Sequence, residues 1–410
     1  MVSYNQYKIR SNFSTKFPYL LDLITTKLFF SGIRKIKNPE KILIIRNDHI
    51  GDMALATPVW RELKKCFPNS RITVLADPIN KILIEKDSNV DEIIDIGLFW
   101  RKKNLKSLLN YLKILRKIRK ERFDVGIDLR RSWLNIFLFL FLGKVKARVS
   151  YYNINGGKAF LTHPIFYDKK INVINENINL IEKSFNLKLE NNIPKIYTSK
   201  EDNKDVQNFL NKNKLKKYIL IAPGATIDSK QWPKEKYTQF IEKFLKKYKN
   251  IKILIAGGPD EKELVERLAR INKKMCLPVV AFNLRQFSIL CGKSELFIGN
   301  DGGADAIAWI GGAKNILLNG PVDMSIHLPL KNTITIHHIL SCYPCDWSGP
   351  CPLKEKTGTG CIDPITVEEV LEATEKMLKS KKGEIPNEYW HAEGDGELIK
   401  SPAERFIFHY

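Results

Sequence analysis

Residues Lys41–Leu63 read KILIIRNDHIGDMALATPVWREL and combine three features in one short stretch. Ile42 to Ile45 form a continuous apolar run, which is typical of a strand buried on both faces of a parallel sheet. A polar turn containing Gly51 follows, and apolar residues then recur at helical spacing from Met53 to Leu63. The stretch therefore predicts a strand, a glycine-containing turn and a helix, which is the repeating unit of an α/β fold.

Asp52 lies in the turn of this unit. Ligands of doubly wound sheets bind outside the carboxyl ends of the strands, so a carboxylate at this place is a candidate for chemistry. The alternative is that Asp52 only caps the helix and interacts with its dipole. This stretch alone leaves both interpretations open.

The same pattern continues along the chain. We expect strands at 71–76, 91–96, 123–128 and 147–150, and a long basic helix over about 105–122. Residues 168–200 are rich in Asn and are interpreted as irregular. The pattern then restarts, with strands predicted at 218–222, 251–256, 296–299 and 315–318. Strands that alternate with helices indicate two α/β domains with parallel sheets, joined near residue 200.

The charge of the chain is strongly positive. Lys and Arg number 67 against 45 for Asp and Glu, which gives +22. This balance suggests an anionic partner, or simply lysine-rich solvated helix faces. No aromatic and basic platform, helix-turn-helix or zinc-finger spacing supports nucleic-acid binding. No run reaches the roughly 18 to 20 apolar residues of a membrane span, and no signal peptide is recognisable. We therefore expect a cytoplasmic protein. Residues 1–40 are a basic amphipathic extension that either contacts an anionic membrane surface or, as is commoner, packs on the first domain.

Two turns of the second domain suit a phosphate group. The first follows a predicted strand and contains Gly224, Thr226, Ser229 and Lys230, which offer backbone N–H groups, hydroxyl groups and a positive charge. The second turn is Asn300-Asp301-Gly302-Gly303, where the glycines allow close approach of a ligand. Asp301 either accepts a hydrogen bond from a sugar hydroxyl or caps the helix. Together the two turns favour a nucleoside-diphosphate ligand.

Four segments carry a resemblance to a known family: ILIIRNDHIGDMALATPVWRELKKCFPNSRITVLADP, IAPGATIDSKQWPKEKYTQFI, LRQFSILCGKSELFIGNDGGADAIAWIGG and LLNGPVDMSIHLPL. Over about residues 41–375 the chain resembles glycosyltransferase family 9, the heptosyltransferases of lipopolysaccharide assembly. The resemblance implies the GT-B fold, with two facing Rossmann-like domains and a cleft between them. It also implies an inverting transfer without a catalytic metal or other cofactor.

Residue by residue, the resemblance places the catalytic acidic residue on Asp52 and donor contacts on Lys230 and Asp301. It implies an acceptor-binding domain at 41–200, a donor-binding domain at 201–375 and a tail at 376–410 that packs back on the first domain. The expected co-substrate is a nucleotide sugar, ADP-heptose, and the expected acceptor is a lipopolysaccharide core or another anionic glycan. Gly51, Arg130, Arg131 and Lys158 are candidates for acceptor binding, although ordinary surface charge also explains the three basic residues.

The chain departs from the family pattern after Asp301. The family usually carries Met and His where this chain has Asp305 and Ala306. Asp305 would add a negative charge near the diphosphate, which is unfavourable unless it faces a sugar hydroxyl or solvent. The departure leaves the donor sugar open, and it supports a second interpretation, a catalytically silent paralogue that binds glycan or nucleotide.

Four of the seven cysteines cluster at Cys342, Cys345, Cys351 and Cys361. A Cys₄ zinc site is chemically possible, but the spacing of the second pair is not that of a usual zinc ribbon. A structural role without metal is the alternative that we favour. The histidines show no metal-ligand spacing, and His49 either assists in the first turn or faces solvent.

Overall fold

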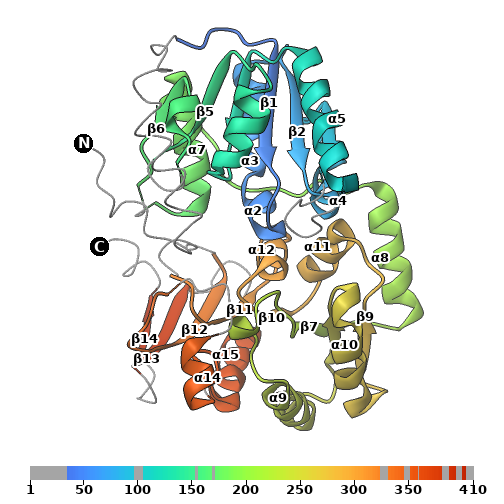
Figure 1. Cartoon of the computed structure of the whole chain (residues 1–410). Coiled ribbons are helices and arrows are strands. Elements are labelled where there is room, and N and C mark those ends of the chain that lie inside the picture. Colours follow the sequence, from blue (N-terminus) through green and yellow to red (C-terminus); the bar gives the residue numbers. More distant parts are fainter. Residues whose placement is uncertain are drawn as a thin grey trace. The chain divides into compact units, whose positions relative to one another are not determined.

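The computed structural model describes residues 35–96, 105–152, 156–168, 171–323, 331–345, 351–358, 360–380, 387–393 and 399–402 (Figure 1). The chain divides into two compact units, Met1–Lys195 and Ile196–Tyr410, called unit 1 and unit 2 below. The predicted N-terminal extension lies outside the described residues, apart from 35–40. The two units are described separately.

Unit 1 contains a six-stranded sheet in the order β3-β2-β1-β4-β5-β6, and every neighbouring pair is parallel. Its strands are β1 (Lys41–Arg46), β2 (Arg71–Ala76), β3 (Glu92–Asp95), β4 (Val125–Asp128), β5 (Ala147–Tyr151) and β6 (His163–Ile165). The apolar run Ile42–Ile45 is fully buried in β1 near the centre of the sheet. This is the doubly wound order expected of a Rossmann-like domain.

Helices pack against this sheet, as Figure 1 shows for α3, α5 and α7. The helical elements are α2 (Ile50–Leu55), α3 (Thr57–Cys66), α4 (Pro78–Ile84), α5 (Leu105–Glu121), α6 (Trp133–Asn135), the π-helix η2 (Ile136–Phe141), η3 (Lys158–Phe160) and α7 (Val173–Phe185). The predicted helix from Met53 to Leu63 is divided at Ala56, and Pro58 stands in the first turn of α3. Proline is tolerated there because the first N–H groups of a helix have no partner within it.

Helix α7 corrects the prediction that residues 168–200 are irregular. It runs over Val173–Phe185, with its amino end capped by Asn172, whose side chain accepts a hydrogen bond from the Asn175 N–H. The missed signal is the helical spacing of Ile174, Ile178, Ile181 and Phe185, of which the last three are buried. The Asn-rich composition obscured this pattern.

Unit 2 contains an eight-stranded sheet in the order β14-β13-β12-β11-β10-β7-β8-β9, parallel except for the β13–β14 pair. Its strands are β7 (Tyr218–Ala222), β8 (Lys252–Ala256), β9 (Cys276–Val279), β10 (Leu296–Asn300), β11 (Asn315–Asn319), β12 (Thr333–Ile339), β13 (Glu388–Glu393) and β14 (Ile399–Pro402). Six of these strands, from β9 to β12, repeat the doubly wound order of unit 1.

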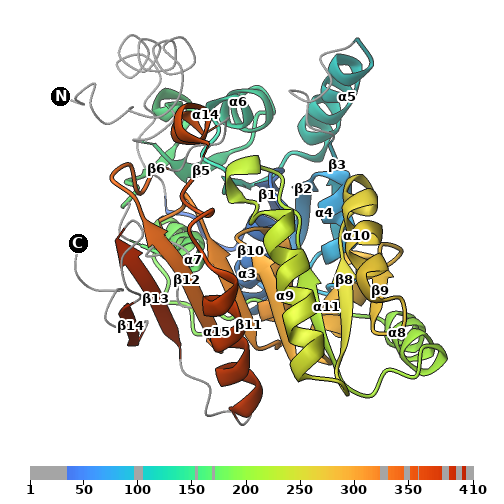
Figure 2. The ribbon, with the colours of Figure 1, turned by 90° about the horizontal axis from the view of Figure 1, so that it is seen from below.

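Helices cover both faces of this second sheet. Its helical elements are α8 (Lys200–Lys212), η4 (Asp228–Lys230), α9 (Lys234–Lys247), η5 (Pro259–Glu261), α10 (Lys262–Ala269), η6 (Arg270–Asn272), α11 (Leu284–Gly292), α12 (Gly303–Ile310), α14 (Pro352–Thr357) and α15 (Val367–Lys379). One core joins α9, α10 and α15 to the sheet, and Figure 2 shows α9 beside α15. A second core joins α8, α11 and α12 to the opposite face.

The described part of the C-terminal tail does not behave as predicted. Strand β13 pairs in parallel with β12, and β14 pairs antiparallel with β13, so that residues 388–393 and 399–402 extend the sheet of unit 2 instead of packing on the first domain. Trp390 is fully buried in the core of unit 2. Burial of this large aromatic side chain gives a physical reason for the tail to stay with the second sheet.

None of the helices in the described part of the chain is both long enough and apolar enough to cross a membrane. The apolar run 136–142 was predicted as a buried or surface-seeking helix, and its residues 136–141 form the π-helix η2. Phe139 and Leu140 lie in the core of unit 1, and Phe137 and Phe141 pack against that core.

Candidate active site at two switch points

The predicted site residues follow the strands at which each sheet reverses its winding direction. In unit 1, Asp52 follows β1, and Arg130 and Arg131 follow its neighbour β4. In unit 2, Gly224–Lys230 follow β7, and Asn300 ends its neighbour β10, with Asp301–Gly303 directly after it. The crevice at such a switch point is the general ligand site of doubly wound sheets. Each unit therefore has one candidate site, with residues from two neighbouring strands.

Arg46 organises the site of unit 1. It is the last residue of β1 and is only 4% exposed. Its guanidinium donates a hydrogen bond to the Leu129 carbonyl oxygen and forms ion pairs with Asp48, at 3.2 Å, and Asp52, at 2.8 Å. A buried guanidinium needs such partners because an unpaired buried charge is costly. Arg46 thus connects the exit of β1, helix α2 and the exit of β4.

Asp52 lies in the first turn of α2 and is not its N-cap residue, so an interaction with the helix dipole stays an alternative. The N-cap residue of α2 is His49, no side chain caps the helix, and the Asp52 carboxylate instead lies 2.8 Å from the Arg46 guanidinium. The Asp52 side chain is 28% exposed. It is therefore a carboxylate that is held by a buried cation and is open to solvent on its other side.

The two arginines after β4 occupy a conformationally restricted turn. Arg131 has a φ of +60°, a left-handed conformation that is uncommon for a residue with a side chain. Its guanidinium forms an ion pair with Glu176 of α7 at 3.1 Å and stacks 4.5 Å from the ring of Tyr167. Burial raises the pKa of Glu176, although Arg131 and Arg46 oppose this shift. Sequence analysis missed Glu176 because it lies in α7, which was interpreted as irregular.

Arg130 contacts the loop that follows β1. Its guanidinium donates to the Asn47 carbonyl oxygen at 3.5 Å, and burial lowers its pKa. Lys158 lies in η3, where its ammonium is 4.6 Å from the ring of Tyr152. Among the described residues, neither an ion pair nor a hydrogen bond joins Lys158 to Asp52. Gly51 is the second residue of α2 and directly precedes Asp52.

Asp128 holds the turn that carries Arg130 and Arg131. It is fully buried at the end of β4, and its carboxylate accepts hydrogen bonds from the Ser132 N–H at 2.8 Å, the Asn135 amide at 2.9 Å and the Ser150 hydroxyl at 3.3 Å. Burial raises the pKa of Asp128 to about 6 and outweighs the opposing effect of the hydrogen bonds from Asn135 and Ser132. The charged groups near it are Arg130 and Asp48.

This raised pKa predicts a pH dependence of stability. A carboxyl group with a pKa of about 6 in the folded state and about 4 in the unfolded state stabilises the fold below pH 4, and this contribution is lost as the pH rises through 6. We expect the melting temperature of wild type, relative to Asp128→Asn, to fall between pH 4 and pH 7. If the difference in melting temperature stays constant or rises with pH, the three donors keep the Asp128 carboxylate ionised.

In unit 2 a single buried side chain joins the two candidate turns. The Asn300 amide donates to the carbonyl oxygens of Pro223, at 2.9 Å, and Gly224, at 3.1 Å. Its oxygen accepts from the Trp232 N–H at 3.1 Å and the Tyr237 hydroxyl at 3.2 Å. Because all its hydrogen-bonding groups are used within the protein, Asn300 shapes the site and is not itself available to a ligand.

Lys230 and Asp301 face each other across the same site. The Lys230 ammonium forms an ion pair with the Asp301 carboxylate, and both side chains are largely buried. The hydroxyl of Thr226 lies in an exposed residue, whereas Ser229 is only 3% exposed. In the part of the chain that the structure describes, the Ser229 hydroxyl has no hydrogen-bond partner. The roles of Thr226, Ser229 and Lys230 in donor binding stay predictions.

Gly302, next to Asp301, has open space beside it, whereas the space beside Gly224 is filled. A Cβ atom at Gly302 would meet no other atom within 4 Å, and Gly303 begins α12 directly after it. A Cβ atom at Gly224 would overlap the carboxylate of Glu261, which also lies against Gly257 after β8. Glu261 accepts a hydrogen bond from the Gly258 N–H at 2.8 Å. Sequence analysis missed this acidic group beside the first turn.

Asp305, where the sequence suggested an added negative charge near the diphosphate, is buried. Its side chain is buried on α12 and faces neither solvent nor an open site. Burial, together with the nearby charge of Asp301, raises the pKa of Asp305 well above its ordinary value. This shift favours the protonated form of Asp305 relative to an exposed carboxyl group.

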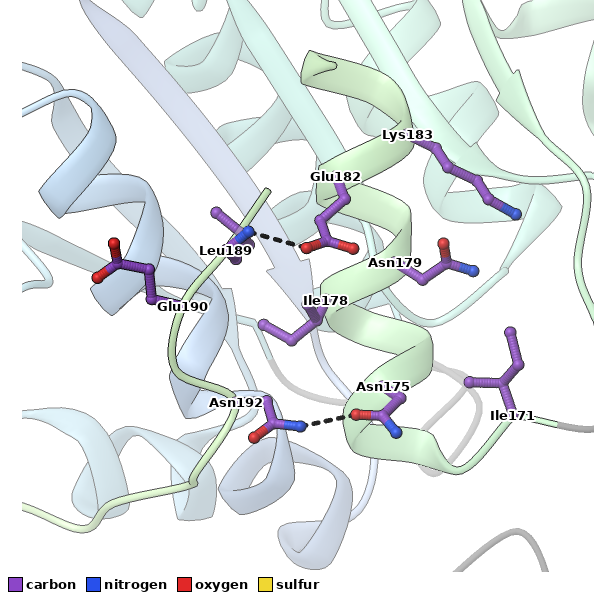
Figure 3. A pocket seen from close by; sticks show the side chains of 9 residues that line it. All are labelled: Ile171, Asn175, Ile178, Asn179, Glu182, Lys183, Leu189, Glu190 and Asn192. Carbon is purple, nitrogen blue, oxygen red and sulfur yellow. Dashed lines mark hydrogen bonds between the residues drawn. The ribbon is translucent and has the colours of Figure 1, made fainter. Parts of the chain in front are cut away.

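The structure describes all four clustered cysteines and an open cavity in unit 1. Cys361 is buried against Gly320, while Cys342 and Cys345 are exposed, and the described residues contain no group of three His, Cys, Asp or Glu side chains that could hold a metal ion. An open cavity of about 510 Å³ lies between α7 and residues 189–192 (Figure 3). Three of its polar side chains are already paired, because Asn192 donates to Asn175 and Glu182 accepts from the Leu189 N–H.

The chain is similar in sequence to proteins of one known family. The model of a family described as Glycosyltransferase family 9 (heptosyltransferase) matches residues 111–355. Lipopolysaccharide heptosyltransferase 1 of Campylobacter coli is 25% identical over 297 residues, which cover 68% of this chain and 84% of that protein.

Two solved structures show the same fold. A family 9 glycosyl transferase from Veillonella parvula has a TM-score of 0.71 at 21% identity, covering 85% of this chain and 99% of that one. The E. coli heptosyltransferase WaaC with ADP-2-deoxy-2-fluoro heptose has a TM-score of 0.62 at 16% identity, covering 82% and 99%. These likenesses confirm the predicted α/β class and GT-B fold.

Proposed function

Since this chain belongs to glycosyltransferase family 9, the heptosyltransferases, we propose that it transfers a heptose from ADP-heptose to a lipopolysaccharide core or a related anionic glycan. The observation that carries the proposal is the pair of switch-point sites, one with an oriented carboxylate and one with a lysine and glycine-rich turns. Relatives with heptosyltransferase names support the sugar, and WaaC with its ADP-heptose analogue supports the nucleotide.

We assign the donor to unit 2. Lys230 supplies a positive charge for the diphosphate, and the N–H groups around Gly224 and Gly302 supply dipoles. Glu261 ends η5, which follows β8, and its carboxylate lies beside Gly224 in the turn after β7. A carboxylate beside this turn can accept hydrogen bonds from the ribose hydroxyls of a nucleotide. The acceptor is assigned to unit 1, where Arg130 and Arg131 suit anionic groups of a glycan.

The proposed reaction is a single inverting displacement. Asp52 accepts the proton of the acceptor hydroxyl as that oxygen attacks the anomeric carbon of the donor, and the bond to the diphosphate breaks. Arg46 keeps the Asp52 carboxylate in place. Charge that develops on the leaving diphosphate is stabilised by Lys230 and by backbone N–H groups, so this proposal assigns no step to a metal ion or another cofactor.

A catalytically silent, nucleotide-binding paralogue is the second candidate, because Ala306 replaces the usual histidine. The presence of Asp52, Lys230 and Asp301 opposes it. We further propose that the protein acts in the cytoplasm, at the inner face of the cytoplasmic membrane, where a lipid-linked acceptor would be found.

A panel of nucleotide sugars tests the function. We expect ADP-heptose to raise the melting temperature more than UDP- or GDP-sugars, since a ligand stabilises the state to which it binds. Incubation with a heptose-deficient lipopolysaccharide acceptor should then yield product of inverted anomeric configuration, at the same rate with a chelator. Stabilisation without transfer would favour the silent paralogue, and stabilisation by another nucleotide sugar alone would refute ADP-heptose as donor.

A further inference from the structure

We infer that one face of helix α5 is a docking surface for an anionic phospholipid bilayer. This face, called the α5 face below, consists of Leu109, Leu112, Lys113, Arg116 and Lys120. The inference rests on the exposure and charge of these side chains, and it does not depend on the proposed sugar transfer.

The α5 face is a continuous stripe. At about 100° per residue its five side chains fall within an arc of about 100°, and at 1.5 Å per residue they extend over about 16 Å. The opposite side of the helix is occupied, because Tyr111, Ile114 and Ile118 are buried in the core of unit 1. Figures 1 and 2 both show α5 at the outside of unit 1. The α5 face can therefore contact a flat surface while the helix remains folded in place.

Two exposed leucines stand at one end of the stripe. Leu109 is 51% exposed and Leu112 is 42% exposed, whereas most large apolar side chains of unit 1 are buried. Single exposed apolar residues are ordinary, but two of them next to a row of cations match the composition of interfacial helices. Only these two side chains would enter the bilayer, so insertion is shallow and attraction depends strongly on charge.

The cations of the stripe have no acidic partners within the described residues. No ion pair is found there for Lys113, Arg116 or Lys120, although neighbouring Lys117 pairs with Glu92 and Lys41 pairs with Glu121. By contrast, Lys243 and Lys247 of α9 are paired with Glu368 and Glu375 of α15. Unpaired cations beside exposed leucines are complementary to an anionic bilayer, and less so to a neutral surface or to a second positively charged copy of this chain.

Vesicle cosedimentation of the full chain tests the inference. Wild type should bind vesicles that contain phosphatidylglycerol and should bind phosphatidylcholine vesicles much more weakly, with binding lost as salt is raised. The triple variant Lys113→Glu, Arg116→Glu, Lys120→Glu should lower the partition coefficient for anionic vesicles at least tenfold. Leu109→Gln combined with Leu112→Gln should lower it as well, while leaving the charge unchanged.

A matched control separates this face from general charge. Lys246→Glu, Lys249→Glu and Lys274→Glu change the net charge by the same amount at exposed positions of unit 2 and should preserve binding within about threefold. The inference would be overturned if both triple variants lost vesicle binding equally. It would also be overturned if wild type bound neutral vesicles as well as anionic ones. A dimer that forms without lipid and is abolished in the leucine variant would also overturn the inference, because the α5 face would then join two copies of the chain. Transfer to a water-soluble acceptor should be unchanged in the α5 variants, which distinguishes a failure here from a failure of the proposed function.

Discussion

Replacing Asp52 by Asn lowers the rate of sugar transfer by about 10² to 10⁴, which is the usual contribution of a positioned general base. Asn preserves the shape of the side chain but cannot accept the proton of the acceptor hydroxyl. Binding of ADP should barely change, because the proposed donor contacts lie in unit 2. The measurement is the rate of heptose transfer at saturating donor, with the melting temperature recorded in parallel.

Asp48→Asn is the matched control for this variant. Asp48 forms an ion pair with the same Arg46, so this change also removes one carboxylate from the buried guanidinium. Its side chain is less exposed than that of Asp52, 11% against 28%. We expect Asp48→Asn to lose less than tenfold in rate when folded. Equal losses of rate in the two variants would show that Asp52 acts only through Arg46. A folded Asp52→Asn variant with a near-normal rate would exclude Asp52 as the base.

Lys230→Ala is expected to weaken binding of ADP at least tenfold, or about 1.4 kcal/mol or more. The physical reason is the loss of a charge-assisted contact with the diphosphate, while adenosine, which has no phosphate, should bind as before. Isothermal titration calorimetry with both ligands makes the comparison. The structure adds a complication, since Lys230 is paired with Asp301 and a bound phosphate must compete with that carboxylate.

Two further variants separate the possibilities. Lys234→Ala removes an exposed lysine four residues later, at the start of α9, and should leave the affinity for ADP unchanged. Asp301→Asn frees the Lys230 ammonium from its partner and should preserve or increase the affinity for the diphosphate alone. If Lys230→Ala binds ADP like wild type, the role of this residue is confined to its ion pair with Asp301.

The positions of the strands and of the candidate turns were largely predictable from the sequence. A buried parallel strand requires several consecutive apolar residues, so Tyr218–Ala222 and Arg71–Ala76 were recognised with their observed bounds. The turns after them were recognised because Gly, Asn and Asp concentrate where a strand ends and a helix begins. Helix α7 was missed because its asparagines conceal the apolar spacing, and β13 because a single strand beyond the last helix carries no repeating pattern.

The sequence by itself determined which chemical groups stand at the carboxyl edges of the two sheets, because those groups are specified by local patterns of a few residues. Tertiary structure alone decided their partners. Arg46 orients Asp52, Glu176 of α7 pairs with Arg131, and Lys230 meets Asp301, which lies 71 residues away in sequence. Burial likewise decided that Asp305 favours its uncharged form. Such pairings and pKa shifts depend on strand order, register and desolvation, which bring together residues that no local pattern connects.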